Sequence, residues 1–191
     1  MPKIIFWGES VFTFLGLKSI LSDFYPIFDV VYVPLSNKGF IYSFMEIKNS
    51  DFVIASPDEN SLLHYVKVMR EMPVKKNNVM IFAEEKIHKL FEIMCGRRFY
   101  FVNSDSALSV IFESISSFLN GHSVITNNHR NKLSETEFQI ILLIAKGWSL
   151  TKIASITNRS VKTVSAHKIN IIKKMKLTDG QFKLLVSKGE F

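Results

Sequence analysis

The run from Ser160 to Met175 constrains the fold more than any other stretch, because its pattern fits a helix with two chemically different faces. At roughly 100° per residue, Val164, Ile171 and Met175 fall on one narrow apolar stripe. The opposite side is formed by Lys162, Ala166, Ile169 and Lys173, flanked by Thr163, Ser165 and Asn170. Ser160 is a good N-cap, so the first turn presents backbone N–H groups that suit a phosphate. The run therefore predicts a helix that packs on a core and can meet a polyanion.

Residues 149–156 precede this run and read as a short amphipathic helix, with Ile153 and Ile156 on one side. The polar segment 157–159 separates the two helices. A short helix, a three-residue break and a longer capped helix have the spacing of a helix-turn-helix.

Two capping-box patterns predict further helices on either side. Ser134 and Glu137 fit a capping box that opens an apolar helix, and Thr178 and Gln181 fit a second one that opens a final helix. We therefore expect residues 132–191 to form an all-α domain of four short helices.

Several spaced motifs occur in this region, namely Leu133-Ser-x-x-Glu137, Ala145-x-Gly147, Ile153-Ala154, Lys162-Thr163-Val164-x-x-His167 and Lys173-x-Met175. Together they resemble the LuxR/FixJ-type DNA-binding domain. The stretch 162–168 looks closest to the RcsA-like branch, the auxiliary capsule-synthesis regulators of enteric bacteria. The resemblance implies a bacterial transcription regulator whose third C-terminal helix enters the major groove of double-stranded DNA.

The expected DNA contacts come from the outward face of that helix. Lys162 and Lys173 are the best candidates, and Lys162 is near the helix start that usually enters the groove. His167 is expected to contact a phosphate or the groove edge, with a packing histidine as the alternative. Ile169 either meets a thymine methyl or is tolerated there. The full predicted set is Lys162, Thr163, Ser165, Ala166, His167, Ile169, Asn170, Lys173 and Lys174.

The net charge of +7 is confined to the C-terminal part of the chain. Residues 132–191 hold 11 Lys/Arg and 4 Asp/Glu, whereas residues 1–131 hold 13 of each. A neutral apolar module followed by a small basic one is expected of a regulator with a DNA-binding tail. The alternative is a solvated basic surface without a ligand.

The first 120 residues alternate between strand-like and helix-like segments. Strands are expected at 3–7, 27–33, 52–55, 79–83 and 99–102, and helices at 11–22, 40–47, 62–72, 84–94 and 106–119. Five alternations favour a parallel doubly wound sheet, a (βα)5 fold of the α/β class. The polar run 121–131 reads as a linker. The order of elements is similar to that of a response-regulator receiver domain.

A phosphorylatable receiver, by this resemblance, needs paired acids after the first strand, an aspartate ending the third, a hydroxyl residue after the fourth and a lysine after the fifth. The corresponding residues here are Gly8 with Glu9, Ser56, Ala83 and Asn103. One carboxylate is a poor Mg²⁺ site, and a serine is not an acyl-phosphate acceptor. We therefore predict a pseudo-receiver, kept for protein contacts. Asp58 as a substitute acceptor is disfavoured, because Pro57 separates it from the strand end.

Other function classes find little support. The single cysteine, Cys95, excludes an intramolecular disulfide and a cysteine-rich zinc site. There is no Gly-rich phosphate loop, nucleophile elbow or paired catalytic carboxylates, so neither an enzyme nor a cofactor is expected. Glu9 and Lys18 interrupt the apolar opening, and no apolar run reaches the roughly 18 residues of a membrane span. We expect a cytoplasmic protein at the bacterial nucleoid, without membrane contact.

One small domain makes few phosphate contacts, so two half-sites and a dimer are expected, either a homodimer or a heterodimer with a related response regulator. A surplus of apolar residues predicts the dimer surface at Ile111, Phe112, Ile115, Phe118 and Leu119. The resemblance suggests capsule, adhesion or virulence genes as targets. The alternative function is a protein-interaction module that modulates another regulator and touches DNA only weakly.

Overall fold

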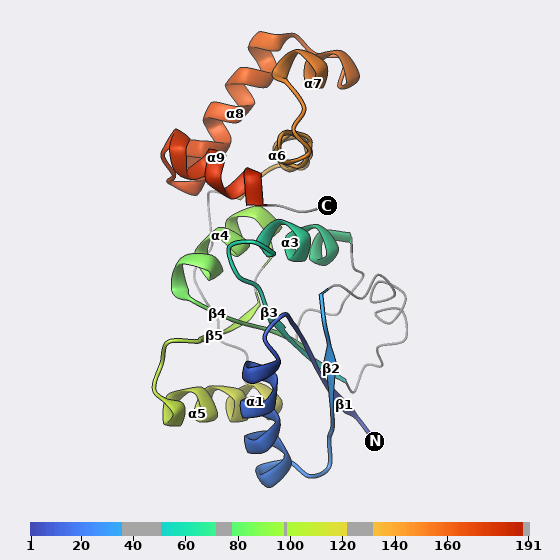
Figure 1. Ribbon diagram of the computed structural model, residues 1–191, viewed down its shortest axis with the longest axis vertical. Coiled ribbons are helices and arrows are strands. Elements are labelled where there is room, and N and C mark those ends of the chain that lie inside the picture. Colours follow the sequence, from blue (N-terminus) through green and yellow to red (C-terminus); the bar gives the residue numbers. More distant parts are fainter. Residues whose placement is uncertain (36–50, 72–77, 98, 122–131, 189–191) are drawn as a thin grey trace. The chain divides into compact units, whose positions relative to one another are not determined.

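The computed structural model describes residues 1–35, 51–71, 78–97, 99–121 and 132–188 (Figure 1). The expected helix at 40–47 and residues 122–131 of the expected linker lie outside these ranges. The chain divides into two compact units, which are described separately. The first consists of residues 1–57, 71–88 and 98–126, and the second of residues 58–70, 89–97 and 127–191.

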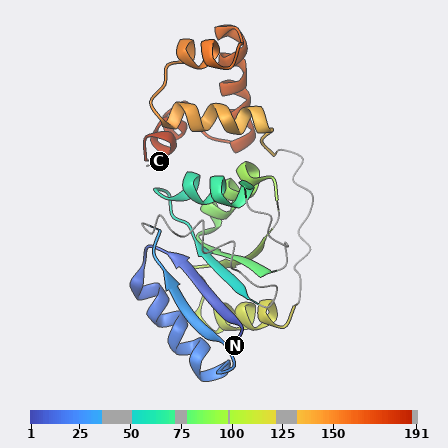
Figure 2. The same ribbon diagram turned by 90° about the vertical axis from the view of Figure 1, so that its right-hand side faces the viewer.

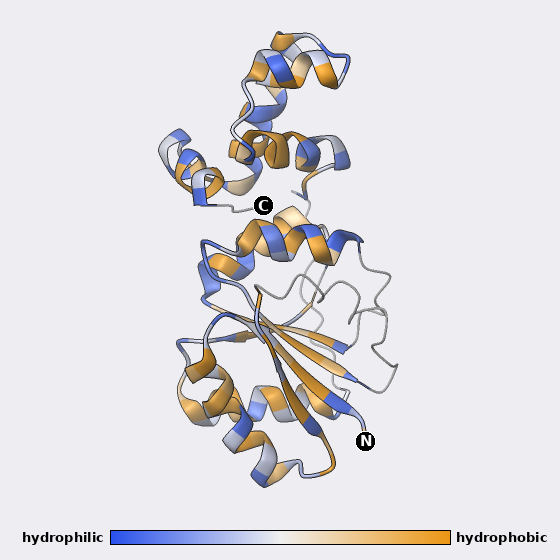
Figure 3. Ribbon diagram, turned by 45° about the vertical axis from the view of Figure 1, so that its right-hand side comes forward, coloured by the Kyte–Doolittle hydropathy of each residue, from blue (hydrophilic) through white to orange (hydrophobic). Residues whose placement is uncertain are grey.

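The first unit contains a five-stranded parallel sheet, which confirms the α/β prediction. Its order is β2-β1-β3-β4-β5, and Figure 2 shows β2, β1 and β3 side by side. The strands are β1 (Lys3–Gly8), β2 (Asp29–Val33), β3 (Phe52–Ser56), β4 (Val79–Ala83) and β5 (Tyr100–Asn103). Parallel strands covered on both faces read as continuous apolar runs, and Figure 3 shows the strands mostly in the hydrophobic colour.

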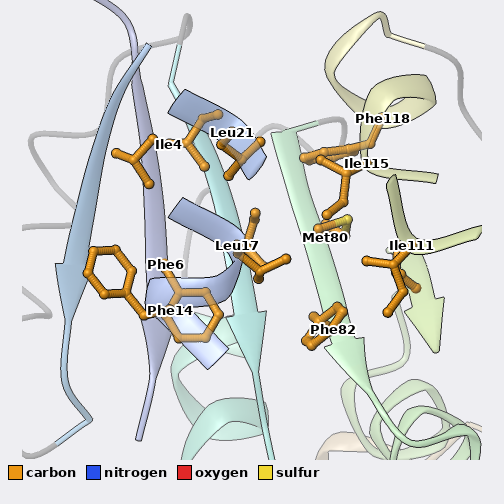
Figure 4. Close-up of a cluster of buried hydrophobic side chains, with 13 residues drawn as sticks. Ile4, Phe6, Phe14, Leu17, Leu21, Met80, Phe82, Ile111, Ile115 and Phe118 are labelled. Carbon is orange, nitrogen blue, oxygen red and sulfur yellow. The ribbon is translucent and has the colours of Figure 1, made fainter. Parts of the chain in front are cut away.

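Helices α1 (Val11–Phe24) and α5 (Leu108–Leu119) cover one face of this sheet. Ser10 caps α1 by accepting a hydrogen bond from the backbone N–H of Thr13 at 3.1 Å. Figure 4 shows side chains from α1, α5 and the strands meeting in one cluster. It includes Ile4, Phe6, Phe14, Leu17, Leu21, Met80, Phe82, Ile111, Ile115 and Phe118.

The expected dimer surface on α5 is wrong for three of its five residues. Ile111, Ile115 and Phe118 are only 7%, 1% and 2% exposed, because they pack into the cluster under α5. Phe112 is partly covered by Phe24, with ring centroids 4.6 Å apart. The apolar stripe of α5 is wide because the helix contacts both the sheet and the end of α1.

The second unit contains nearly all of α3 (Leu62–Glu71), the last part of α4 (Glu85–Cys95) and four C-terminal helices. Cys95 is buried here, and burial raises the pKa of its thiol to about 11. Such a thiol is protonated at neutral pH and is a poor nucleophile. Where the described elements were predicted, their ends differ from the expected ones by two residues at most.

The four C-terminal helices are α6 (Glu135–Ala145), α7 (Leu150–Ile156), α8 (Val161–Met175) and α9 (Asp179–Lys188), which confirms the predicted all-α domain (Figure 1). Both capping boxes are present. In the first, Ser134 Oγ accepts from Glu137 N–H at 3.2 Å and Glu137 Oε2 accepts from Ser134 N–H at 2.7 Å. In the second, Thr178 and Gln181 exchange bonds of 2.9 and 3.2 Å.

Candidate nucleic-acid interface

The start of α8 is capped as its sequence predicts. Ser160 is extended, and its Oγ accepts a hydrogen bond from the backbone N–H of Thr163 at 3.0 Å. The Thr163 hydroxyl lies 2.8 Å from the same oxygen. The first turn contains no acidic residue. The first N–H groups of a helix have no partner within it, so this end attracts anions.

The two faces of α8 differ in burial as expected. Val164, Ile171 and Met175 are fully buried and form the core side of the helix. Ser165 and His167 are half-buried between the two faces. The exposed predicted residues are Lys162, Thr163, Ala166, Ile169, Asn170 and Lys173. An exposed surface with two lysines, three small or polar residues and one isoleucine can contact both phosphates and base edges.

Lys174 is directed into its own domain. Its Nζ lies 2.6 Å from Glu137 Oε2 and 3.2 Å from the carbonyl oxygen of Lys132. Glu137 is only 4% exposed, and burial alone would raise its pKa. Hydrogen bonds from Lys174 and Ser134 outweigh burial and lower the pKa of this carboxyl below its usual value. Lys174 therefore neutralises a buried carboxylate that also caps α6.

Lys168 also has an acidic partner within the protein. Its Nζ lies 2.8 Å from Asp179 Oδ1 and 5.8 Å from the centre of the Phe182 ring. Lys183 contacts the other oxygen of Asp179 at 3.1 Å. Hydrogen bonds from Lys168 and then Lys183 lower the pKa of the Asp179 carboxyl. This ion-pair cluster links the middle of α8 to the start of α9.

Sequence reasoning missed Arg159, in the turn between α7 and α8. Its guanidinium Nη1 lies 3.2 Å from His167 Nε2, and its Nη2 donates a long hydrogen bond of 3.5 Å to Thr136 Oγ1. Asn158, immediately before it, has a left-handed φ of 51°. The polar composition of the turn was a signal, but the sequence did not show that an arginine here reaches α6.

The residues expected at a degenerate phosphorylation site lie at the carboxyl ends of the strands. Gly8 pairs with Ser56 across β1 and β3, and Ala83 pairs with Asn103 across β4 and β5. These residues end parallel strands, so their strand ends share an edge. Glu9 follows directly and is exposed. Within the described ranges, no group of three or more His, Cys, Asp or Glu residues could hold a metal ion.

The packing around Gly8 leaves little room for an acidic side chain. A Cβ atom at this position would lie 2.8 Å from Phe6 Cε1 and 3.2 Å from Ser56 Cβ. An aspartate here therefore requires the Phe6 ring, which belongs to the core cluster, to move.

Asp58 acts as a local cap. Its Oδ1 accepts from the backbone N–H groups of Asn60 at 3.1 Å and Ser61 at 2.8 Å, and the Ser61 hydroxyl also bonds to it. These bonds stabilise the turn that leads into α3.

The family model "Bacterial regulatory proteins, luxR family" matches residues 131–181 of this chain. Among curated proteins, the response regulator VraR of Staphylococcus saprophyticus is 30% identical over 198 residues, covering 94% of this chain and 93% of that protein. VraR of Staphylococcus epidermidis is 28% identical over 196 residues, covering 93% and 91%.

Solved structures of RcsB share the fold. RcsB from Salmonella enterica serovar Typhimurium, bound to a promoter in the presence of a phosphomimetic, has a TM-score of 0.57 at 17% identity, covering 98% of both chains. A second RcsB–DNA complex has a TM-score of 0.53 at 18% identity over the same coverage.

Among the described residues, no helix is both long and apolar enough to span a bilayer.

Proposed function

This chain belongs to the response-regulator family, in the group with a luxR-type C-terminal domain, and we propose that it is a bacterial transcription regulator whose α8 binds double-stranded DNA. The observation that carries the proposal is the exposed face of α8. Lys162 and Lys173 are exposed on it, and neither takes part in an ion pair in the part of the chain that the structure describes. The proposed surface consists of Lys162, Thr163, Ser165, Ala166, His167, Ile169, Asn170 and Lys173. The ion pair with Glu137 favours leaving Lys174 outside it.

We propose that the protein binds DNA as a dimer, either with itself or with a related response regulator. A single domain with one recognition helix makes too few contacts for tight specific binding, and a dimer places two helices in successive major grooves. The 162–168 stretch supports a place near the RcsA-like branch, and thus capsule, adhesion or virulence genes as targets. Transcriptional control requires access to the chromosome, so the proposal places the protein in the cytoplasm, at the nucleoid.

A protein-interaction module with only weak DNA contact of its own is the second candidate function. Its support is the retained receiver-like sheet, whose strand ends lack the acids of a phosphorylation site. A mobility-shift titration on genomic promoter fragments, with and without a related regulator, separates the two. Specific retention that is lost when Lys162 and Lys173 of this chain are replaced by alanine supports the transcription regulator, whether or not a companion is needed. Retention that occurs only with the companion and survives both substitutions supports the module.

Two lysine substitutions are expected to differ in kind. Lys162→Ala is expected to cost about 1–3 kcal/mol on a specific site and to relax its sequence preference, because we propose that this side chain reads a base edge. Lys173→Ala is expected to weaken binding on all sequences and to reduce the salt slope by about one, as for loss of one phosphate contact. Fluorescence anisotropy on specific and random duplexes over a range of salt concentrations measures both. If Lys162→Ala lost equal affinity on both duplexes, Lys162 would be assigned to a contact with the DNA backbone.

We further propose that the receiver-like domain acts without phosphorylation. Incubation with acetyl phosphate and Mg²⁺ is expected to give no phosphorylated species in intact-mass measurements, and beryllofluoride is expected to leave DNA binding unchanged. The physical reason is the lack of an acid pair, since a lone Glu9 cannot hold Mg²⁺ well. A phosphorylated species that persists in Ser56→Ala and disappears in Asp58→Asn would contradict the proposal and assign Asp58 as the acceptor.

A further inference from the structure

We propose that Arg159, braced by His167 and Thr136, is a separate anchor for one phosphodiester group of the DNA backbone. The anchor rests on the proposed function, because it assumes that α8 meets DNA. The anchor adds a contact with the DNA backbone from the turn that precedes α8. Its role is to position the protein on the DNA, which differs from reading bases.

The position of Arg159 is fixed on both the backbone and the side chain. Its backbone N–H donates to the carbonyl oxygen of Ala154 at 2.9 Å, and the preceding Asn158 takes the left-handed conformation that turns the chain. The guanidinium then reaches His167 on α8 at 3.2 Å and Thr136 on α6 at 3.5 Å. A side chain that is already oriented loses less conformational entropy when it binds a ligand.

The partners of Arg159 leave its charge unneutralised. A guanidinium only donates, so Nε2 of His167 is the atom that would accept in this contact. Neither the imidazole of His167 nor the hydroxyl of Thr136 carries a negative charge. No ion pair within the described residues includes Arg159, although Lys168, Lys174 and Lys183 each have a carboxylate partner.

The chemistry of an exposed, braced guanidinium matches a phosphate. Arginine carries five N–H donors in a planar fork and binds phosphate oxygens in pairs, and two acceptors use only part of this capacity. The side chain bridges the first turn of α6 and His167, which lies between the two faces of α8, so it lies at the flank of the proposed surface. Contacts from such a position fix the register on the backbone and carry no sequence information directly.

The test measures the salt dependence of binding by the full-length protein. The probe is a random-sequence 30-base-pair duplex, followed by fluorescence anisotropy between about 50 and 200 mM KCl. Arg159→Gln keeps a side-chain donor for His167 and removes the charge. We expect it to bind about tenfold more weakly at 0.1 M salt and to reduce the slope of log K against log salt by about 0.9.

Two further variants separate charge from structure. Arg159→Lys keeps the charge and loses the fork, so its salt slope is expected to match wild type although its affinity falls. Lys183→Gln removes an equal charge from α9 and is expected to leave the slope unchanged. If Arg159→Gln proves unstable in thermal melts, Arg159→Lys decides, because a reduced slope in that variant contradicts a charge contact.

The inference and the proposed function fail in different ways. A wild-type protein without salt-dependent DNA binding would overturn the proposed function itself. Wild-type binding that responds to Lys173→Ala, combined with a wild-type slope for Arg159→Gln, would overturn only the anchor. A loss for Arg159→Gln on one specific sequence but not on random DNA would also overturn it, because base reading would then be its role.

Discussion

Ala166→Asp is expected to weaken DNA binding at least about 100-fold while the protein stays folded, because like charges brought together at an interface cost several kcal/mol. Ala166 is exposed on the same face of α8 as Lys162 and Lys173. A carboxylate at this position would be repelled by the DNA phosphates that the two lysines are proposed to attract. An aspartate inside a helix lowers the free energy of unfolding by only about 0.7 kcal/mol relative to alanine. Anisotropy with a promoter duplex measures the first effect, and urea unfolding followed by circular dichroism measures the second.

The matched control places the same charge on another helix. Leu184 on α9 is exposed, so Leu184→Asp changes the net charge of the domain equally without entering the proposed surface. We expect its DNA affinity to fall less than about threefold, from long-range repulsion alone. If Leu184→Asp lost as much affinity as Ala166→Asp, net charge and not the α8 face would control binding, and the proposed surface would be wrong.

Lys174→Met is expected to lower the free energy of unfolding by about 3 kcal/mol, because it breaks an ion pair with a buried carboxylate. Glu137 is nearly inaccessible, whereas Lys174 still reaches water. Removing the lysine leaves a buried carboxylate without its cation, although Ser134 still donates to it. Methionine keeps much of the volume of the lysine stem, so the loss reports the charge. Urea unfolding of the full chain, followed by tryptophan fluorescence and circular dichroism, measures it.

The loss of stability in Lys174→Met is expected to depend on pH. The folded pKa of Glu137 lies below its unfolded value, which is about 4.3, so its ion pair contributes full stability above that value and loses it as the pH falls through the folded pKa. In Lys174→Met the lysine no longer lowers the pKa of this carboxyl, so the pKa is expected to rise in the direction that burial favours. The deficit relative to wild type is therefore expected to shrink between about pH 7 and pH 4. A deficit that stayed constant over this range would contradict the ion-pair explanation.

Lys183→Met is the control for this pair. Lys183 is exposed, and its contact with Asp179 is an i,i+4 ion pair on the helix surface. Such a pair contributes little to stability, because solvent screens it and both side chains stay mobile, so Lys183→Met is expected to leave the free energy of unfolding nearly unchanged. The comparison therefore separates a buried carboxylate from an exposed one within the same domain.

Much of the secondary structure follows from local signals in the sequence. The capping boxes at Ser134 and Thr178 and the N-cap at Ser160 form as predicted, because each depends on residues within three positions of one another. The strands follow from apolar runs, since a parallel strand is buried on both faces. The core side of α8 follows from helical periodicity, which places Val164 and Ile171 on one stripe.

The apolar residues of α5 show where this reasoning fails. This segment has more apolar positions than one buried stripe needs, so we predicted that some of them lie at the surface. The structure buries Ile111, Ile115 and Phe118, because the helix packs against the sheet and against α1 residues that are far away in sequence. The sequence does not specify how many neighbours surround a helix.

The sequence by itself determined the family resemblance, the two kinds of domain and the basic face of α8, because local periodicity and spacing encode them. Only the tertiary structure decided which cations on that domain are already paired. Lys174 meets the carboxylate of Glu137 across 37 positions, whereas Arg159 meets the neutral hydroxyl of Thr136 across 23. A charge in a sequence can bind DNA or a carboxylate of its own chain, and only the folded distances distinguish the two.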